Sequence, residues 1–391
     1  MQERKVKKVL FNACMYTSKP NGNGIYIREA YNLLSKKLEE AGIEYTGYAY
    51  NADNLINKNN IKIITIPFAT KNSFNRLLGF HRIFWNIFIL PFIALKYDLV
   101  YCFSNHGSPF IKNQIITIHD LICLQFPQQN RLQYLYNKYL LPYIISACKQ
   151  IVTISNYTRA EVVKYFSVDL SKIAVIHNGG DHFTNAILPI PITQKKYLAS
   201  LTGDKKFFLS VGATYPHKNV EPLIKAISQL STDYVLVITG QQNKYFQQLK
   251  LLIQSTNVQN VILLDYVDNA LLSYLYSKCI ANVYLSLNEG FGFPPMEAAF
   301  YNKVSIISNC GALPEIYGDS AYYADPYNFE EIRKALLFVA SPEFNTDDFQ
   351  RKYNNLFATY TWQNTANKIT ITIVNALSAK EEHLNKIEQF G

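Results

Sequence analysis

Short apolar runs alternate with stretches of helical periodicity along this chain, and the alternation stops once and then begins again. Runs of β-branched and aromatic residues that are followed by helices are typical of a parallel sheet with helices on both faces. The pattern breaks over residues 184–206, which contain two prolines and a glycine. We therefore predict an α/β fold with two doubly wound, Rossmann-like domains, 1–185 and 186–361. A third segment, 362–391, is predicted to be largely one long helix.

The same periodicities predict the individual elements. In the first half the predicted strands are 7–14, 44–50, 61–66, 99–104, 114–119, 151–155 and 172–177, and the helices are 24–41, 131–148 and 156–166. In the second half the predicted strands are 207–211, 234–239, 261–264, 281–287 and 304–308, and the helices are 220–230, 245–255, 269–277 and 296–300. Ligands of such sheets bind outside the carboxyl ends of the strands, so the loops at those ends are the candidate sites.

The composition is that of a folded intracellular protein. At 391 residues, with 49% hydrophobic and 17% charged residues, the chain is long enough for two domains with separate cores. Its charged start, Met1 to Lys8, does not resemble a signal peptide. The six cysteines are scattered without a C-x-x-C pair, which is typical of reduced thiols. We therefore expect a cytoplasmic protein.

The net charge of +9 indicates an anionic partner such as a nucleotide, a nucleic acid, a membrane surface or a phosphorylated acceptor. Nucleic acid is the weaker choice, because the basic residues form no dense block. The apolar stretch Ile83 to Leu95 is too short to span a bilayer. Two interpretations of it remain open: a helix lying on an anionic membrane surface, with Arg76, Arg82 and Lys96 around it, or a helix packed on a sheet.

The second half contains the stretch Glu289-Gly-Phe-Gly-Phe-Pro-Pro-Met-Glu297, followed by Asn-Cys-Gly-Ala-Leu-Pro-Glu at 309–315. It places two carboxylates eight positions apart across a turn between a predicted strand and a predicted helix. A strand that ends in glycines before a helix N-terminus presents free backbone N–H groups and the positive end of a dipole. This arrangement predicts a site for a phosphorylated ligand.

Three other loops at carboxyl ends carry candidate residues. Gly22 and Gly24 precede the first helix and permit close backbone approach, although Asn-Gly is also an ordinary turn. His119-Asp120 follows a strand; a lone histidine is more often structural, but this position favours a function. The run Val211-Gly-Ala-Thr-Tyr-Pro-His-Lys-Asn219 brings Lys218 to a helix N-terminus, a good position to neutralise a diphosphate. The alternative is that Lys218 is a solvated surface lysine, and the glycine and proline before it make that less attractive.

Taken in order, these residues resemble a known family, and the resemblance covers nearly the whole chain. It is similar to the GT-B glycosyltransferases, specifically the large retaining family 4. The motifs that carry this likeness are Gly22-Asn-Gly-Ile-Tyr26, Thr117-Ile-His-Asp-Leu121, Thr153-Ile-Ser-Asn-Tyr157, Val175-Ile-His-Asn-Gly179, Pro216-His-Lys-Asn219, the Glu-x7-Glu element and Leu313-Pro-Glu315. The resemblance implies two domains facing a cleft and a C-terminal helix that crosses back to the N-terminal, acceptor-binding domain.

The resemblance also implies a role for each candidate residue. Glu289 would contact the hydroxyls of the donor sugar, and Glu297 would hold the ribose hydroxyls of the nucleotide. His119 would lie beside the reacting sugar and Asp120 beside the acceptor. Lys218 would pair with the diphosphate. The remaining implied donor contacts are Gly22, Gly24, Gly212, the backbone amides of Phe291, Gly292 and Phe293, and the Tyr266-Val267 backbone under the base.

The chain departs from the family's common pattern at Ala213 and His217, where many relatives carry arginine. Neutralisation of the diphosphate would then fall on Lys218 and helix dipoles, with His217 as a helper. The sequence contains no Asp-x-Asp triplet for a metal ion, so we predict a reaction without metal or other cofactor. Retention through a carboxylate nucleophile and reaction on one face of the sugar both remain open.

The resemblance is strongest to bacterial mannosyl- and rhamnosyltransferases of surface polysaccharides such as O-antigen, capsule and lipopolysaccharide. It implies GDP-mannose as the first choice of donor, with dTDP-rhamnose or a UDP-hexose as alternatives. The implied acceptor is a glycan or lipid-linked saccharide at the cytoplasmic face of the membrane. Rival hypotheses are an epimerase or phosphorylase of the same architecture, or a non-catalytic carbohydrate-binding protein. No oligomeric state is predicted.

Overall fold

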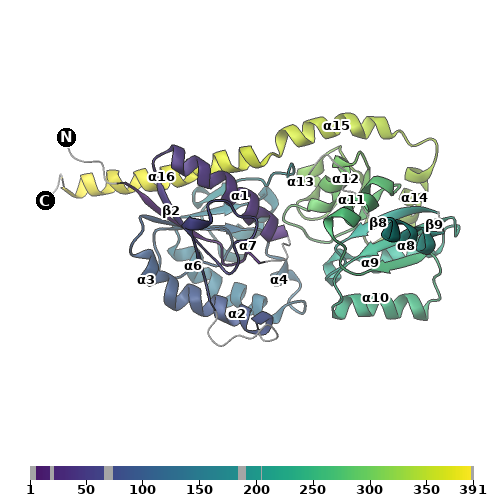
Figure 1. Ribbon diagram of the computed structural model, residues 1–391, viewed down its shortest axis with the longest axis horizontal. Helices are drawn as coiled ribbons and strands as arrows, with labels where there is room; N and C mark the ends of the chain where they lie inside the picture. Colours follow the sequence, from purple (N-terminus) through teal and green to yellow (C-terminus); the bar gives the residue numbers. More distant parts are fainter. Residues whose placement is uncertain (1–5, 18–21, 66–73, 184–190, 204, 389–391) are drawn as a thin grey trace. The chain divides into compact units, whose positions relative to one another are not determined.

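The computed structural model describes residues 6–17, 22–65, 74–183, 191–203 and 205–388. The chain forms two compact units (Figure 1). The first unit contains Met1–Gly179 together with Tyr360–Gly391, and the second contains Gly180–Thr359. Several sequence predictions fall on residues outside the described ranges: the start of the chain, Ser18 to Asn21 before the first helix, the end of the strand 61–66, and part of the break at 184–206.

The first unit is built on a seven-stranded parallel sheet with strand order β3-β2-β1-β4-β5-β6-β7. Its strands are β1 (Lys8–Asn12), β2 (Glu44–Ala49), β3 (Ile61–Ile63), β4 (Leu99–Cys102), β5 (Gln114–Ile118), β6 (Gln150–Thr153) and β7 (Ile173–Val175). The central strands β4 and β5 are buried along their whole length, which explains their mostly apolar sequences. The order reverses between β1 and β4, so the loops after these two strands flank the switch point.

Helices cover both faces of this sheet. On one face α1 (Gly22–Glu40) contacts α16 (Trp362–Glu388), as Figure 1 shows. The other helices of the unit are α2 (Phe74–Phe84), α3 (Leu90–Ala94), α4 (Ile122–Gln125), α5 (Arg131–Leu135), α6 (Leu141–Ala147) and α7 (Asn156–Phe166). Wide π-helical turns, η2 (Trp85–Ile89) and η3 (Tyr136–Leu140), join α2 to α3 and α5 to α6. Single 3-10 turns are η1 (Lys58–Asn60) and η4 (Leu170–Lys172).

The start of α16 is fastened to the segment that follows β7. The Thr365 hydroxyl donates to the carbonyl of His177 at 2.7 Å. A Cβ on Gly179 would lie 2.2 Å from the backbone nitrogen of Trp362, so the two backbones approach as closely as glycine allows. The last helix therefore belongs to the first unit through specific contacts as well as through its apolar face.

The second unit is built on a six-stranded parallel sheet with order β10-β9-β8-β11-β12-β13. Its strands are β8 (Lys206–Val211), β9 (Tyr234–Thr239), β10 (Val261–Leu264), β11 (Asn282–Tyr284), β12 (Ser305–Ser308) and β13 (Tyr322–Ala324). Its helices are α8 (Ile192–Thr202), η5 (Pro216–Lys218), α9 (Val220–Ser228), α10 (Lys244–Ser255), α11 (Asn269–Lys278), α12 (Phe293–Phe300), α13 (Leu313–Tyr317), α14 (Phe329–Ala340) and α15 (Thr346–Thr359). Here the order reverses between β8 and β11.

The α/β prediction is confirmed, and the differences have local causes. The predicted strand 281–287 ends at Tyr284, because Leu287 leaves the sheet and donates its N–H to the carbonyl of His217 at 2.8 Å. Helix α12 begins three residues before its predicted start, at Phe293, because prolines are tolerated in the first turn. The patterns of α2, α8, β13, α14 and α15 were not recognised in the sequence. Residues 192–202, placed in the break between domains, are helical.

One continuous helical stretch, Leu77–Ala94, is long and apolar enough to cross a membrane by length and composition alone. The apolar stretch Ile83 to Leu95 alone is too short to span a bilayer, but the helix that contains it begins earlier. Trp85, Asn86 and Leu90 are buried against the first unit, so one side of the helix is part of a folded domain.

Candidate functional site

The candidate residues of the second unit lie on loops that leave the carboxyl ends of β8 and β11. These strands are neighbours at the point where the strand order reverses, so their loops emerge side by side. The loop after β8 runs from Gly212 to Asn219 and the loop after β11 runs from Leu285 to Gly292. The two loops are bonded to each other, because Ser286 Oγ and Leu287 N–H both donate to the carbonyl of His217.

Lys218 and Glu289 meet where these loops touch. Lys218 Nζ lies 2.6 Å from Glu289 Oε1 and 2.7 Å from the hydroxyl of Tyr284. Tyr284 in turn donates to the same Oε1 at 2.6 Å, and the ammonium lies 5.0 Å from the centre of its ring. The three side chains therefore form a closed cluster in which a buried carboxylate is paired and hydrogen-bonded, as such a charge requires.

The charges in this cluster follow from burial and proximity. Burial would raise the pKa of Glu289, but the Lys218 ammonium and its hydrogen bond hold that pKa below its ordinary value. Burial and the same ammonium lower the pKa of His217 to about 4. At neutral pH Glu289 is thus an anion and His217 a neutral imidazole. Two of the three ammonium protons point at Tyr284 and Glu289, which leaves one donor for another oxygen.

Two glycines make this packing possible. Gly311 has a φ of +63°, and a Cβ there would lie 2.6 Å from the backbone nitrogen of Glu289. The next residue, Ala312, donates its N–H to the carbonyl of Glu289 at 3.0 Å. Gly292 has a φ of +83° and its carbonyl accepts a hydrogen bond from Tyr317. The stretch 309–317 therefore holds the backbone of the Glu289 loop in place.

Glu297 is in a different electrostatic state. It lies inside α12 and accepts a 2.7 Å hydrogen bond from Tyr276 on α11. Burial raises the pKa of Glu297 to about 7, and the Tyr276 hydrogen bond only partly opposes this. The two carboxyl groups of the Glu-x7-Glu element thus differ: Glu289 is charged, whereas Glu297 titrates near neutral pH.

The other predicted donor contacts are placed as follows. Gly212 has a φ of +82° and open space where a Cβ would stand, while Ala213 beside it is buried. Tyr266 is exposed and Val267 half-buried directly after β10. Phe291 is buried against Phe293, at the N-terminus of α12. Their roles stay predictions.

In the first unit, His119 directly follows β5 and is buried. Its Nε2 lies 2.8 Å from the carbonyl of Phe103, and a carbonyl only accepts, so Nε2 carries the proton and Nδ1 the lone pair. Burial lowers the pKa of His119 to about 4, so the ring is neutral at neutral pH. Tyr26 on α1 packs against it edge-on at 4.6 Å, and Tyr26 also contacts Trp362.

The remaining predicted residues of the first unit lie at the same edge of its sheet. Asp120 is half-buried, and its carboxylate accepts from the N–H of Ile122 at 3.2 Å. Gly22 begins α1 and is exposed, and Gly24 one half-turn later is buried. The structure therefore brings together Lys218 and Glu289, and it places the other predicted residues at the carboxyl edge of one sheet or the other.

Sequence reasoning missed Tyr284 and Tyr276, which hold the two glutamates. Tyr284 closes the Lys218–Glu289 cluster and Tyr276 is the hydrogen-bond partner of Glu297. No motif identifies them, because tyrosine is abundant here, with 29 in the chain. The sequence does indicate that both tyrosines lie in apolar segments, and a buried tyrosine hydroxyl needs a polar partner.

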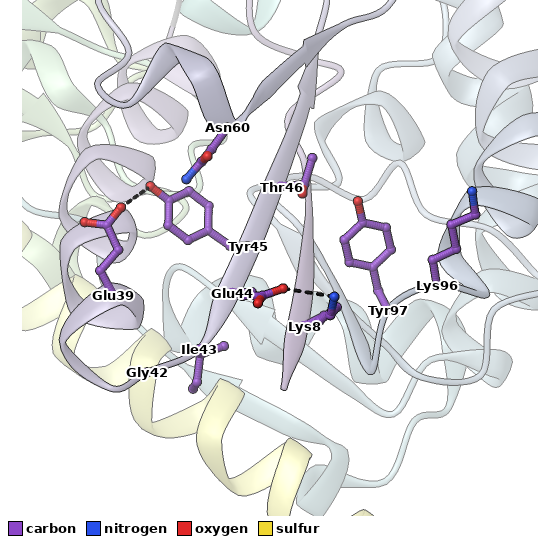
Figure 2. Close-up of a pocket in the computed structure, with 10 residues that line it drawn as sticks. All are labelled: Lys8, Glu39, Gly42, Ile43, Glu44, Tyr45, Thr46, Asn60, Lys96 and Tyr97. Atoms are coloured by element: carbon purple, nitrogen blue, oxygen red, sulfur yellow. Dashed lines mark hydrogen bonds and ion pairs between the residues drawn. The ribbon is translucent and has the colours of Figure 1, made fainter. Parts of the chain in front are cut away.

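A hollow lies at the opposite edge of the first sheet, where β1 and β2 begin. Figure 2 shows two pairs of its polar side chains that face one another. Lys8 pairs with Glu44 at 3.0 Å, and the Tyr45 hydroxyl donates to Glu39 at 3.0 Å. These groups satisfy each other, and the hollow is at the amino ends of the strands, so it is not a candidate catalytic site.

Two parallel α/β units with candidate residues at their carboxyl edges are the architecture of the GT-B class. Two family patterns match the chain: Glycosyltransferase Family 4 over residues 31–182 and Glycosyl transferases group 1 over residues 194–355. The chain belongs to glycosyltransferase family 4, the glycosyl transferases group 1. The resemblance seen in the sequence is thereby confirmed, and the protein is a glycosyltransferase.

Curated relatives carry more specific names. The chain is similar to the O-antigen chain mannosyltransferase RfbU of Salmonella typhimurium, with 28% identity over 77% of this chain and 82% of that protein. It is also similar to the O-antigen chain mannosyltransferase B of Escherichia coli, with 27% identity over 61% of this chain and 65% of that protein.

Solved structures share the fold. Sucrose-phosphate synthase from Thermosynechococcus elongatus aligns with a TM-score of 0.71 and 15% identity, over 95% of this chain and 100% of the other. Anabaena Alr3699/HepE, solved in complex with UDP-glucose, aligns with a TM-score of 0.65 and 15% identity, over 95% of this chain and 99% of the other.

Proposed function

We propose that this protein is a retaining glycosyltransferase that moves mannose from GDP-mannose to a glycan or lipid-linked saccharide, at the cytoplasmic membrane face, in the synthesis of a bacterial surface polysaccharide. The observation that carries the proposal is the Lys218–Tyr284–Glu289 cluster at the switch point of the second sheet. The names of the mannosyltransferase relatives support the choice of sugar and of pathway.

In this proposal the second unit binds the donor. Glu297 as the carboxylate accepts two hydrogen bonds from the ribose diol, which requires the ionised form. Glu289 accepts from hydroxyls of the sugar. Its Oε1 already accepts hydrogen bonds from Lys218 and Tyr284, so the carboxylate is held in position before the nucleotide sugar binds.

The leaving diphosphate gains negative charge as the bond to the sugar breaks. Lys218 has one N–H beyond those used by Tyr284 and Glu289, and the N-termini of α9 and α12 add backbone dipoles. Arginine is absent at both 213 and 217, where His217 is neutral. We propose that these groups suffice without a metal ion, so that transfer continues in a chelator such as EDTA.

The state of Glu289 favours reaction on one face of the sugar over a covalent glycosyl-enzyme. A carboxylate whose pKa is lowered by an ammonium, and whose oxygen accepts two hydrogen bonds, is a poor nucleophile. In the proposed step the bond from the anomeric carbon to the phosphate oxygen breaks. The acceptor oxygen bonds to that carbon on the same face, and the acceptor proton passes to the leaving phosphate.

His119 is neutral, with its Nε2 proton directed at Phe103. We propose that its Nδ1 accepts a hydrogen bond from a sugar hydroxyl, and that Asp120 faces the acceptor. His119→Ala should then lower kcat while GDP binding is largely kept. A kcat unchanged by this substitution contradicts the role of His119.

The donor is identified with the purified full chain and a panel of GDP-mannose, dTDP-rhamnose, UDP-glucose and the free nucleotides. We expect the largest thermal shift with GDP and GDP-mannose, and release of GDP with a saccharide acceptor. Glu297→Ala should lose the shift, whereas Glu330→Ala, which removes a partly exposed carboxylate on α14, should keep it. A chain that responds to no nucleotide refutes the proposed function, and a response to UDP or dTDP alone refutes the choice of donor.

A further inference from the structure

The helical stretch that ends in α3 has a counterpart 51 residues later in the one that ends in α6. The first reads Phe-Trp-Asn-Ile-Phe-Ile-Leu-Pro-Phe-Ile over 84–93, and the second reads Leu-Tyr-Asn-Lys-Tyr-Leu-Leu-Pro-Tyr-Ile over 135–144. Asparagine, leucine, proline and the final isoleucine are the same in both, and three of the four aromatic positions of the first copy are aromatic in the second. The two segments therefore form an internal repeat.

The structure is repeated as well. Each copy contains a π-helical turn, Trp85–Ile89 or Tyr136–Leu140, followed by an α-helix with a proline in its first turn. A proline inside a helix lacks an N–H and crowds the carbonyl four residues earlier, and the wider turn accommodates it. Each copy is anchored by its buried asparagine: Asn86 accepts from Asn12 at 2.7 Å, and Asn137 accepts from Asn105 at 3.0 Å.

The two copies lie on one face of the first sheet and share one core. Their inward residues belong to a single cluster of buried apolar side chains. Where α2 passes α5, a Cβ on Gly79 would lie 3.1 Å from Leu132. Figure 1 shows α2, α3 and α6 together on the side of the sheet away from α1 and α16. Outward residues of the two copies therefore belong to one side of the unit.

Those outward residues are apolar at matching positions. They are spaced four apart in each helix, and the extra residue of the π-turn keeps each row in line. The exposed pairs match closely: Phe88 and Tyr139 are 57% and 59% exposed, and Phe92 and Tyr143 are 72% and 68% exposed. We call six exposed side chains the twin-helix surface: Phe84, Phe88, Phe92, Leu135, Tyr139 and Tyr143.

The chain segment that carries this surface has a net charge of one sign. Residues 54–160, which include both copies, contain eleven Lys and Arg but only two acidic residues, Asp98 and Asp120. Their net charge of +9 equals that of the whole chain, so the rest of the sequence is neutral. Lys96 and Lys138 are exposed within or next to the two helices, and neither helix contains an acidic residue.

We propose that the twin-helix surface docks this protein on an anionic lipid bilayer, with both helices lying in the interface. Exposed apolar areas of this kind mark contact sites, and Phe, Tyr and Lys are the residues that suit the boundary between acyl chains and headgroups. Anionic headgroups complement the positive segment. A second copy of the chain is a poor occupant, because a contact through this surface would bring two segments of +9 together.

The docking is peripheral. Trp85, Asn86 and Leu90 face the core of the first unit, and their counterparts Tyr136, Asn137 and Leu141 do the same. Only the outward row of each helix is available to lipid, because the inward row cannot leave the sheet without unfolding the unit.

The test measures sedimentation of the full chain with vesicles of phosphatidylcholine, with and without phosphatidylglycerol. No nucleotide sugar or acceptor is present, so the result is independent of the proposed function. We expect binding to the phosphatidylglycerol vesicles, and a fall of about tenfold or more for Phe88→Ser/Phe92→Ser and equally for Tyr139→Ser/Tyr143→Ser. The matched control is Leu251→Ser/Tyr327→Ser, at equally exposed apolar positions of the second unit, and it should bind like the wild type.

The charge component is tested with Lys96→Gln/Lys138→Gln. We expect roughly a fivefold loss for each lysine on phosphatidylglycerol vesicles, and a similar loss for the wild type in high salt. Three outcomes overturn the proposal: no binding of the wild type to anionic vesicles, binding that survives all four aromatic substitutions, or a wild-type dimer that these substitutions dissociate. A loss of binding with Phe88→Ser/Phe92→Ser but not with Tyr139→Ser/Tyr143→Ser refutes joint docking by both helices.

Discussion

Glu297→Gln tests the central electrostatic difference between the two site carboxylates. Burial raises the pKa of Glu297 from 4.5 to about 7, so the folded protein keeps this proton after the unfolded chain has lost it. Between these pH values the folded state binds more protons, and stability therefore falls as pH rises. Below pH 4.5 the raised pKa of Glu297 does not reduce the free energy of unfolding. Above pH 7 the reduction is complete.

The magnitude follows from the two pKa values. One pKa unit corresponds to about 1.4 kcal/mol, so the cost above pH 7 is about 3 kcal/mol. Glutamine has the shape of the protonated acid, keeps an oxygen to accept from Tyr276, and does not ionise. We expect Glu297→Gln and wild type to be equally stable near pH 4.5, and the variant to be more stable by about 3 kcal/mol at pH 8.

The assay is urea unfolding across this pH range, followed by far-ultraviolet circular dichroism. Both tryptophans, Trp85 and Trp362, belong to the first unit, so their fluorescence follows that unit and provides an internal control. The fluorescence transition should be the same in variant and wild type. A stability difference that is constant from pH 4.5 to pH 8 would refute the reasoning.

Two further substitutions test the packing. Tyr284→Phe removes the hydroxyl that donates to Glu289, so we expect unfolding of the second unit to be about 1 kcal/mol easier, measured by circular dichroism; no change would contradict the bridging role. Gly179→Ala places a Cβ 2.2 Å from Trp362 N, and should destabilise the first unit by roughly 2–4 kcal/mol in tryptophan fluorescence melts. Gly79→Ala, which meets only the flexible end of Leu132, is the control that should be tolerated.

The fold class was predictable because most strands contain a short apolar run and most crossover helices have a periodicity of their own. Strands 234–239 and 261–264 and helix 156–166 have the predicted bounds. The errors occur where tertiary contacts override local pattern. Leu285 to Leu287 are apolar enough for a strand, but Ser286 and Leu287 bond to the loop after β8 instead.

The candidate site was predictable in part. Strand ends, glycines and motif order located Lys218, Glu289, Glu297 and His119 at carboxyl edges of the sheets. Their protonation states were beyond the sequence, because each depends on burial and on a partner remote along the chain. Glu289 and Lys218 are 71 positions apart, and the Nε2 proton of His119 is directed by a carbonyl 16 positions away.

By itself the sequence determined that this chain forms two doubly wound units, since hydrophobic periodicity is local and each element can be recognised within its own length. It also determined the family, because short motifs keep their order whatever their distance in space. Only the tertiary structure decided that one glutamate is held as an anion while the other titrates near pH 7, and that the exposed aromatic residues of two helices 51 residues apart lie on the same side of the first unit. These properties arise from desolvation and proximity, which depend on how distant segments pack.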